Sequence, residues 1–251
     1  MINGDEAISN KVAVVTGAAS GIGQAQTRIF LQHGYRVIAI DKQAYQINEK
    51  DASEKLTVIQ ADLSMRTNIT DILNTILASH NSLDVLCNTA GILDGYQTIE
   101  ETSPELWHQV FACNIDSMFY LTKALLPLLL EGSPGVIINM ASIAGMTAGG
   151  GGIAYTTVKH AVIGFTKQLA YDYASMGLRV NAIAPGAIKT PMNQADFDGD
   201  GQMAQWVAEQ VPMKRWAQAQ EVANLTYYLA SDNSTYIQGA VIPIDGGWLI
   251  R

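Results

Sequence analysis

A short apolar run that leads through a glycine-rich loop into a helical pattern constrains the fold more than any other stretch of this chain. The run spans Lys11 to Thr16, the loop reads Gly17-Ala-Ala-Ser-Gly21-Ile-Gly23, and the helical pattern continues to His33. Glycines let a backbone approach a diphosphate closely, and the helix that follows supplies free N–H groups and the positive end of its dipole. Strand, glycine loop and helix in this order indicate a nucleotide-binding βα unit.

The spacing of the glycines narrows the kind of nucleotide site. No Gly-Lys-Ser/Thr follows the loop, which excludes the phosphate loop of nucleoside triphosphatases. The spacing G-x-x-x-G-x-G also differs from the G-x-G-x-x-G of larger dehydrogenases. A glycine turn without a ligand remains the alternative at this point.

The next strand indicates which dinucleotide would fit. It spans Tyr35 to Ile40 and ends at Asp41, about 20 positions beyond the glycines. A carboxylate there binds both hydroxyls of an adenosine ribose and repels a 2'-phosphate, so NAD is favoured over NADP. Lys42 offsets part of that repulsion, and a plain turn residue is the alternative interpretation of Asp41.

Strands and helices alternate along the rest of the chain. Strands are expected at residues 56–61, 83–88, 136–140, 179–184 and 240–244, and helices at about 64–80, 104–130, 154–176 and 221–231. Such alternation predicts an α/β fold with a doubly wound parallel sheet that carries helices on both faces. The length suits one domain, residues 1–251, and no repeat or linker divides it.

The charge balance argues against polyanionic partners. The chain carries a net charge of −8 at pH 7. Binding of nucleic acid needs basic patches that displace counterions, so no nucleic-acid partner is expected. An acidic carrier protein is disfavoured for the same reason.

Neither secretion nor membrane insertion is expected. The polar stretch Met1 to Asn10 cannot form the apolar core of a signal peptide. The longest apolar run, Ala124 to Leu130, is far shorter than the roughly 20 residues that span a bilayer. A cytoplasmic location is therefore expected, with Cys87 and Cys113 as reduced, structural residues.

Tyr155 and Lys159 lie four residues apart in a stretch that is expected to be helical. One helical turn separates them, so the phenol and the ammonium share a face. A cation beside a phenol favours the phenolate, which lowers the tyrosine pKa from about 10 and makes Tyr155 a candidate general acid/base. Ser142, which closes the apolar run 135–141 just upstream, strengthens this interpretation.

Residues 187–218 follow a less regular pattern and are expected to form a mobile cover over the site. Within them, residues 196–201 imitate the start of a calcium-binding loop, but Val207 stands where a bidentate Glu is needed. A solvated acidic turn is therefore preferred, and no metal site is expected. Candidates for an apolar substrate pocket, with plain packing as the alternative, are Met146, Met192, Met203, Trp206 and Trp216. The tail Trp248 to Ile250 suggests either a subunit contact or packing on its own domain.

Taken together, these segments resemble the short-chain dehydrogenase/reductase family over nearly the whole chain. The matching positions are Thr16 to Gly23, Asp62, Asn88 to Gly91, Asn114, Ser142, Tyr155, Lys159, Asn181 to Gly186 and Asp245 to Gly247. The resemblance implies a Rossmann-like sheet of seven strands with a nicotinamide cofactor at their carboxyl ends. It also implies a homo-oligomer, a tetramer before a dimer, packed through the two long helices.

The resemblance also implies roles for particular residues. Tyr155 would exchange a proton with the alcohol or carbonyl oxygen, Ser142 would hydrogen-bond that oxygen, and Lys159 would hold the nicotinamide ribose. Asn114 would anchor a water that links Lys159 to solvent, helped by a distortion of its helix. The implied cofactor-binding residues are Gly17, Ser20, Gly21, Ile22, Gly23, Asp41, Asp62, Leu63, Asn88, Ala90, Gly91, Tyr155, Lys159, Pro185, Gly186, Ile188 and Thr190. Thr89 stands where the family often has a second Asn, so altered local bonding is expected there.

An NAD-dependent oxidoreductase that interconverts a secondary alcohol and its ketone is the preferred hypothesis. A 3-oxoacyl thioester (carrier-protein) reductase is the nearest alternative, and Asp41, Asp94 and the acidic turn 196–200 oppose it. A non-catalytic NAD(H)-binding regulator is the second alternative, since fold alone does not establish activity.

Overall fold

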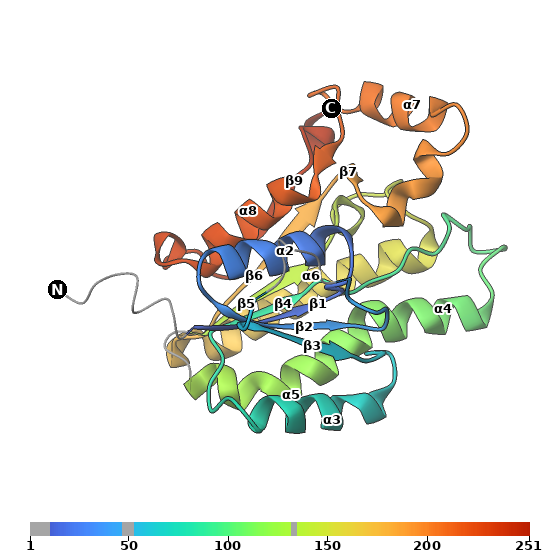
Figure 1. Ribbon diagram of the computed structural model, residues 1–251. Coiled ribbons are helices and arrows are strands. Elements are labelled where there is room, and N and C mark those ends of the chain that lie inside the picture. The colour runs from blue at the N-terminus through green and yellow to red at the C-terminus, as the bar shows by residue number, and fades with distance from the viewer. Residues whose placement is uncertain (1–10, 47–52, 132–134) are drawn as a thin grey trace.

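A parallel sheet of seven strands forms the centre of the protein (Figure 1). The computed structural model describes residues 11–46, 53–131 and 135–251, so the expectation for Met1 to Asn10 lies outside the described residues. The strand order is β3-β2-β1-β4-β5-β6-β9. The strands are β1 (Val12–Thr16), β2 (Arg36–Asp41), β3 (Leu56–Gln60), β4 (Val85–Asn88), β5 (Val136–Met140), β6 (Arg179–Pro185) and β9 (Val241–Ile244). The predicted α/β class and seven-stranded sheet are confirmed.

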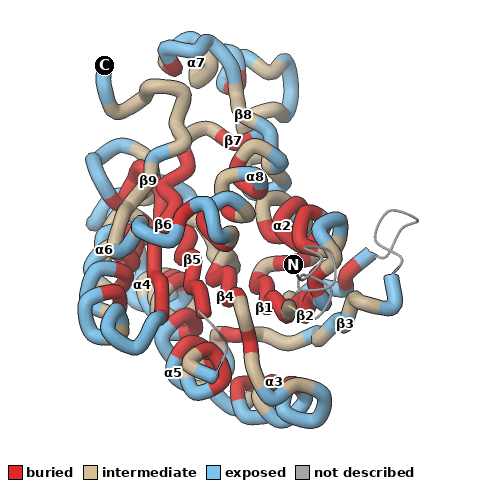
Figure 2. Tube along the Cα trace, turned by 90° about the vertical axis from the view of Figure 1, so that its left-hand side faces the viewer, coloured by how far each residue is buried: buried red, intermediate tan, exposed pale blue. Residues whose placement is uncertain are grey.

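The central strands are buried along their whole length because helices cover both faces of the sheet. Every residue of β1, β4, β5 and β6 is buried, as the red strands of Figure 2 show. Continuous runs rich in Val, Ile and Ala are typical of such doubly covered parallel strands. β3 lies at the edge of the sheet, and its residues are partly or fully exposed.

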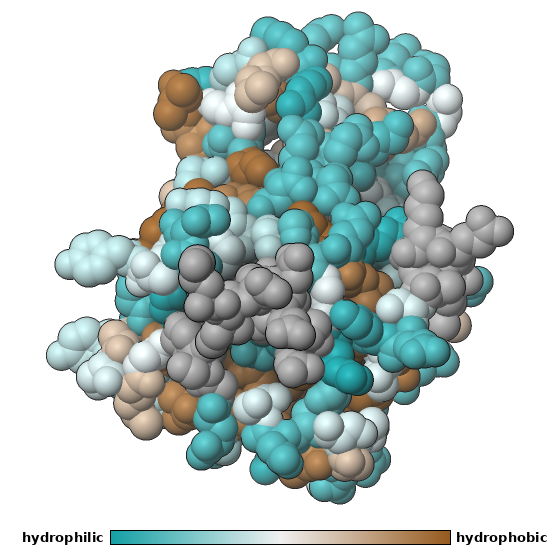
Figure 3. Space-filling model, turned by 60° about the vertical axis from the view of Figure 1, so that its left-hand side comes forward, coloured by the Kyte–Doolittle hydropathy of each residue, from teal (hydrophilic) through white to brown (hydrophobic). Residues whose placement is uncertain are grey.

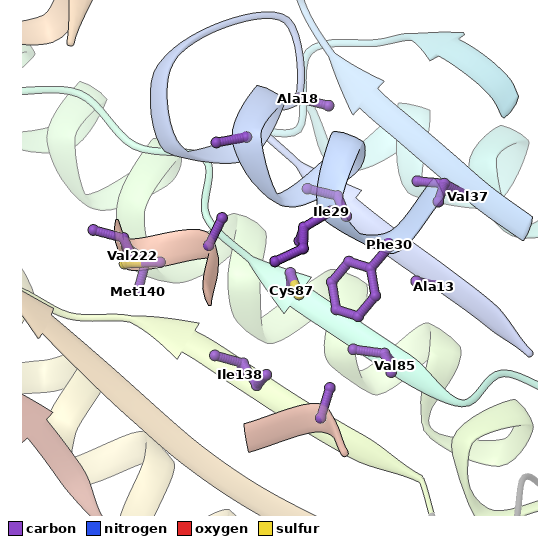
Figure 4. Close-up of a cluster of buried hydrophobic side chains, with 14 of the residues drawn as sticks. Ala13, Ala18, Ile29, Phe30, Val37, Val85, Cys87, Ile138, Met140 and Val222 are labelled. Carbon is purple, nitrogen blue, oxygen red and sulfur yellow. The ribbon is translucent and has the colours of Figure 1, made fainter. Parts of the chain in front are cut away.

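Successive residues of β1 face opposite layers of helices. Ala13 and Val15 belong to a buried cluster with α2 and α8, part of which Figure 4 shows around Phe30, while Val12 and Val14 pack with α3, α5 and α6. The helices are α2 (Gly21–Gln32), α3 (Arg66–Leu77), α4 (Pro104–Phe111), α5 (Ser117–Glu131), α6 (Ile153–Tyr173), α7 (Gln202–Gln210) and α8 (Ala219–Ala230). The predicted two-sided arrangement is therefore confirmed.

The strand order reverses between β1 and β4, and this reversal fixes where a ligand can bind. From β1 the chain proceeds outward through β2 and β3, and it then returns to β4 on the other side of β1. The loops after β1 and β4 consequently diverge at the carboxyl edge of the sheet. In open α/β sheets the crevice at such a reversal is the usual ligand site.

Two segments differ from the regular pattern. The helix expected over residues 104–130 is interrupted by a π-helical stretch, Ala112–Asp116, between α4 and α5. The segment 187–218 is more regular than expected. It contains a 3-10 helix (Pro191–Phe197), α7, and the strands β7 (Ile188–Lys189) and β8 (Ala217–Gln218), which pair in parallel. Its mobility stays a prediction.

The exterior is mixed in polarity. On the face drawn in Figure 3, hydrophobic residues occupy several separate areas between polar ones. None of the helices in the described ranges combines the length and the apolar composition that crossing a bilayer requires.

Candidate active site

A cavity of about 1150 Å³ opens at the carboxyl edge of the sheet. It exceeds the roughly 300–1,000 Å³ that is usual for one small ligand, so it has room for a dinucleotide beside a substrate. The lining includes all but two of the residues to which the family resemblance assigns a catalytic or cofactor-binding role. These are Gly17, Ser20, Gly21, Ile22, Gly23, Asp41, Asp62, Leu63, Ala90, Gly91, Ser142, Tyr155, Lys159, Pro185, Gly186, Ile188 and Thr190.

The start of α2 forms one end of this cavity and is built to receive an anion. Ser20 occupies the cap position in extended geometry, its side chain makes no capping bond, and the first turn contains no acidic residue. The N–H groups and the positive helix end are thus left for a ligand. Glycine is needed at position 23, because a Cβ there would overlap the carbonyl oxygen of Gly17. These residues fit the diphosphate of a dinucleotide.

Asp41 ends β2 beside the glycine loop. Its carboxylate accepts hydrogen bonds from the N–H of Ala19 at 2.9 Å and from the N–H of Gln43 at 2.8 Å. These bonds fix the carboxylate at the cavity wall, where the ribose of an adenosine would lie if the diphosphate occupied the start of α2. Asp62 lies on the same wall, and the hydroxyl of Ser64 bonds its carboxylate and holds the Asp62 pKa below its usual value.

Ser142, Tyr155 and Lys159 meet at the centre of the cavity lining. Ser142 follows β5 and caps the 3-10 helix Ile143–Gly145 by accepting a hydrogen bond from Ala144 N–H at 3.1 Å. Tyr155 and Lys159 project from the first turns of α6, and both are buried. The Nζ of Lys159 donates to the carbonyl oxygen of Met140 at 2.8 Å, which anchors the ammonium to the end of β5.

Burial dominates the protonation of this group. It raises the pKa of Tyr155 to about 12, although the hydrogen bond with Ser142 acts to lower this pKa. It also lowers the pKa of Lys159 to about 8. The expected depression of the tyrosine pKa by Lys159 is not found: desolvation of the phenolate raises the pKa of Tyr155, and the Lys159 ammonium donates to Met140 rather than to the phenol.

Asn114 and Asn88 do not line the cavity. The amide of Asn114 bridges the backbone N–H and carbonyl of Ile92 at 3.1 Å and also donates to the carbonyl of Val110, at the π-helical stretch. It thereby ties the loop after β4 to the helix. Asn88 instead bonds Thr122 and Asn139 inside the sheet layer, so its side chain contributes to the core.

Thr89, the departure from the family pattern, forms a side-chain hydrogen bond with Gln26. Its hydroxyl donates to the side-chain oxygen of Gln26 at 2.6 Å, and the amide of Gln26 donates to the Thr226 hydroxyl at 2.8 Å. The N–H groups of Thr89 and Ala90 both donate to the Thr16 hydroxyl. That this bonding differs from the family's stays a prediction, while Thr89, Ala90 and Gly91 line the cavity.

The segment 187–218 and the chain's tail supply an apolar wall. Met192, Met203, Trp206 and Trp216 line the cavity, whereas Met146 does not. Trp216 is held by a bond from its ring N–H to the carbonyl of Ala204 and by its contact with Phe197. Trp248 also lines the cavity, so this part of the tail packs on its own domain, while Ile250 is 88 % exposed.

Sequence reasoning missed several lining residues. Cys113 was expected to be structural, but it lines the cavity. Its position directly before Asn114, a candidate catalytic residue, was the signal in the sequence that could have indicated this. Tyr96 and Arg251 were missed because neither belongs to a motif. Asp94 was interpreted as a charge that would repel an acidic carrier, but it is 2 % exposed and does not face solvent.

Comparisons with known proteins agree with this geometry. A family model described as enoyl-(acyl carrier protein) reductase matches residues 17–249. The chain is 35 % identical to 3beta-hydroxysteroid dehydrogenase 2 of Eggerthella lenta, covering 96 % of this chain and 95 % of that one. It is also 35 % identical to 2-(R)-hydroxypropyl-CoM dehydrogenase of Xanthobacter autotrophicus, over 95 % and 98 %.

Solved structures show the same fold with either nicotinamide dinucleotide. The structure of 4-hydroxyisoleucine dehydrogenase complexed with NADH superposes with a TM-score of 0.89 at 31 % identity, covering 96 % of this chain and 100 % of that one. Another similar structure contains NADP. The extent of these matches establishes that this chain belongs to the short-chain dehydrogenase/reductase family of oxidoreductases.

Proposed function

We propose that this protein is an NAD-dependent oxidoreductase that interconverts a secondary alcohol and its ketone. The observation that carries the proposal is that Ser142, Tyr155 and Lys159 share one cavity with the carboxylate of Asp41. The first three residues supply proton transfer, and Asp41 supplies the preference for a ribose without a 2'-phosphate.

In the proposed mechanism the protein orients the substrate and moves one proton. The phenolate of Tyr155 takes the hydroxyl proton during oxidation, and the resulting phenol returns a proton to the carbonyl oxygen during reduction. The hydroxyl of Ser142 hydrogen-bonds the same oxygen, where negative charge develops. Lys159 binds the nicotinamide ribose, and Asn114 supports the proton path to solvent. The nicotinamide group, when bound, accepts or supplies the hydride.

The substrate is proposed to carry a large apolar portion next to its alcohol. Met192, Met203, Trp206 and Trp216, with Trp248 from the tail, form the cavity wall beyond the catalytic group. We propose that residues 187–218 act as a mobile cover that closes on this portion. The relative 3beta-hydroxysteroid dehydrogenase 2 carries a name that denotes a large apolar substrate, so hydroxysteroids enter the test panel first.

The chain is also proposed to form a homo-oligomer, a tetramer before a dimer, through α5 and α6. Phe119 on α5 is 44 % exposed and Tyr171 on α6 is 83 % exposed, which leaves apolar area on both helices for a second copy. Light scattering on the purified protein tests this. A monomer at micromolar concentration would contradict the proposal.

The activity is tested by nicotinamide absorbance. The purified protein is assayed with hydroxysteroids, polyols, sugars, hydroxy acids, short diols and 3-oxoacyl thioesters, each with NAD(H) and NADP(H). We expect turnover of an apolar secondary alcohol with NAD, and its loss in Tyr155→Phe with NADH binding retained. Turnover restricted to 3-oxoacyl thioesters would favour the carrier-protein reductase, and NADH binding without any turnover would favour the regulator.

A further inference from the structure

Asp94 is a buried carboxylate in the loop after β4, and backbone N–H groups occupy both of its oxygens. Oδ1 accepts hydrogen bonds from Tyr96 at 3.1 Å and from Gly152 at 2.9 Å. Oδ2 accepts one from Tyr155 at 2.8 Å. Since a carboxylate loses much hydration on burial, three such bonds at 2 % exposure indicate a constructed site rather than an incidental contact.

Two of these bonds cap the helix that carries Tyr155. The N-cap residue of α6 is Gly152, which has no side chain to cap the free N–H groups, and Asp94 takes over this task from another part of the chain. The negative charge also faces the positive end of the helix. Because Tyr155 lies in the first turn, its bond to Asp94 fixes the backbone from which the phenol projects.

The two chain segments approach so closely that only glycine fits at position 152. A Cβ on Gly152 would lie 2.6 Å from Oδ2 of Asp94 and 2.5 Å from the carbonyl oxygen of Gln97. That carbonyl accepts the N–H of Ile153 at 3.0 Å. The loop 94–97 and the start of α6 are therefore joined by three hydrogen bonds, and a fourth, from Tyr96 to Asp94, lies inside the loop.

The third hydrogen bond to Asp94 comes from the N–H of Tyr96, and it holds Tyr96 in a strained backbone conformation beside the cavity. Tyr96 has φ +59°, in the left-handed region that a residue with a bulky side chain rarely adopts. Such a conformation is unfavourable and persists only where neighbouring groups enforce it. The bond from Tyr96 N–H to Asp94 supplies that constraint, and the side chain of Tyr96 lines the cavity.

We propose that Asp94 is a positioning residue, which sets the catalytic Tyr155 and the substrate-facing Tyr96 relative to each other through one buried carboxylate. The inference rests on the proposed function, in which Tyr155 transfers the proton. One oxygen, Oδ1, bonds both Tyr96 and the start of α6, so a shift of either segment displaces the other. Substrate placement and proton transfer are thereby coupled.

The charge of Asp94 adds an effect that a purely structural cap would lack. The groups that act on the Tyr155 phenol are Lys159 on its own helix, Ser142 after β5 and Tyr96 after β4, with the Asp94 carboxylate acting through its charge from beneath the helix start. Burial raises the pKa of Tyr155 most, and Tyr96 and Asp94 raise it further. Removal of the Asp94 charge therefore lowers the pKa of Tyr155.

Asp94→Asn tests the proposal, since it keeps the size, removes the charge and replaces one acceptor by a donor. The amide oxygen can serve Tyr155 or the Tyr96–Gly152 pair, but not both. We expect kcat to fall roughly 10- to 100-fold through misplacement of the phenol, NADH affinity to stay unchanged, and the acid limb of the alcohol-oxidation profile to move to lower pH. The Tyr155 titration, isolated as the absorbance difference from Tyr155→Phe in each background, shifts the same way and needs no substrate.

Asp84→Asn is the matched control. Its carboxylate also accepts a backbone hydrogen bond, from Val12 N–H at 2.7 Å, but at the amino-terminal edge of the sheet, away from the cavity. This variant is expected to lose stability while keeping kcat and the pH profile. The same pattern in Asp94→Asn, with an unshifted Tyr155 titration, would show a merely structural role and overturn the proposal.

A second variant keeps the proposal falsifiable if Asp94→Asn fails to fold. Tyr96→Gly adopts φ +59° without strain and keeps its N–H for Asp94. It should raise KM for the alcohol with little change in NADH affinity, and an unchanged KM would rule out a substrate-facing Tyr96. If Tyr155→Phe retains turnover, the proposed function fails; if it is inactive but Asp94→Asn behaves as the control, only the present inference fails.

Discussion

Lys159 and Tyr155 lie one helical turn apart, yet the ammonium of Lys159 bonds the main chain rather than the phenol. Its Nζ lies 2.8 Å from the carbonyl oxygen of Met140 and 5.3 Å from the centroid of the Tyr155 ring. The protein therefore holds a neutral phenol beside a lysine whose pKa is lowered by burial to about 8.

The buried ammonium should make stability depend on pH. The pKa of Lys159 is about 8 in the folded protein against an ordinary value of 10.5. Between these values the unfolded chain binds a proton that the folded chain does not, so stability rises with pH. Relative to Lys159→Met, the unaltered protein should gain about 2 kcal/mol in the free energy of unfolding between pH 8 and pH 10.

Chemical denaturation at the two pH values measures this difference. Lys167→Met, which removes an exposed lysine of the same helix, controls for the loss of a positive charge. If the free energies of unfolding of the unaltered protein and Lys159→Met differed by the same amount at both pH values, burial would not have lowered the pKa of Lys159. The Met variant should also lack turnover at every pH.

Cofactor choice should depend on Asp41. We expect NADH to bind more tightly than NADPH. Asp41→Asn should reduce the ratio of the two dissociation constants about tenfold, since two like charges near a protein surface repel by more than 1 kcal/mol. The Asn variant keeps an oxygen for Ala19 N–H, so the loop should stay in place. Fluorescence titration with both nucleotides measures the ratio. Equal affinities in the unaltered protein would remove the role proposed for Asp41.

A methyl group at position 152 should damage the site without removing any catalytic side chain. In Gly152→Ala the new Cβ meets Asp94 and Gln97, so the start of α6 must shift and kcat should fall by tenfold or more, on the order of what small misplacements cost. Gly164→Ala is the control, because its Cβ meets nothing within 4 Å in the middle of the same helix. It should raise stability by up to about 1 kcal/mol with full activity.

Measurement of kcat and melting temperature in both variants separates an effect on catalysis from an effect on stability. If Gly152→Ala retained full kcat, the contact between loop 94–97 and α6 would have no bearing on catalysis.

Cys113 should report cofactor binding. Its thiol lines the cavity, whereas Cys87 is fully buried in the sheet. Burial raises the pKa of Cys113, so slow alkylation by iodoacetamide is expected only at alkaline pH. Cys113 should be modified before Cys87, and NADH should slow the reaction. Mass spectrometry of the digested protein identifies the modified residue, and equal rates with and without NADH would place Cys113 outside the cofactor site.

The sequence predicted those parts of the molecule that depend on local pattern. Strand ends, glycine spacing and the four-residue separation of Tyr155 from Lys159 are local, and they predicted the sheet, the glycine loop and the place of Asp41, whereas most other cavity residues came only from the family resemblance. The joint between Asp94 and Gly152 spans 58 residues and leaves no periodic signal. The protonation of Tyr155 was also mispredicted, because burial is a property of the packed fold and not of sequence spacing.

The cavity draws its two halves from different parts of the chain. Its nucleotide end comes mainly from loops anchored to β1, β2 and β4, whereas the apolar wall from Met192 to Trp216 belongs to a segment with its own small strand pair and ring contacts. Substitutions in that wall can therefore accumulate without disturbing the glycine loop or Asp41. A lineage of such proteins can exchange one alcohol for another during evolution while its dinucleotide site is inherited intact.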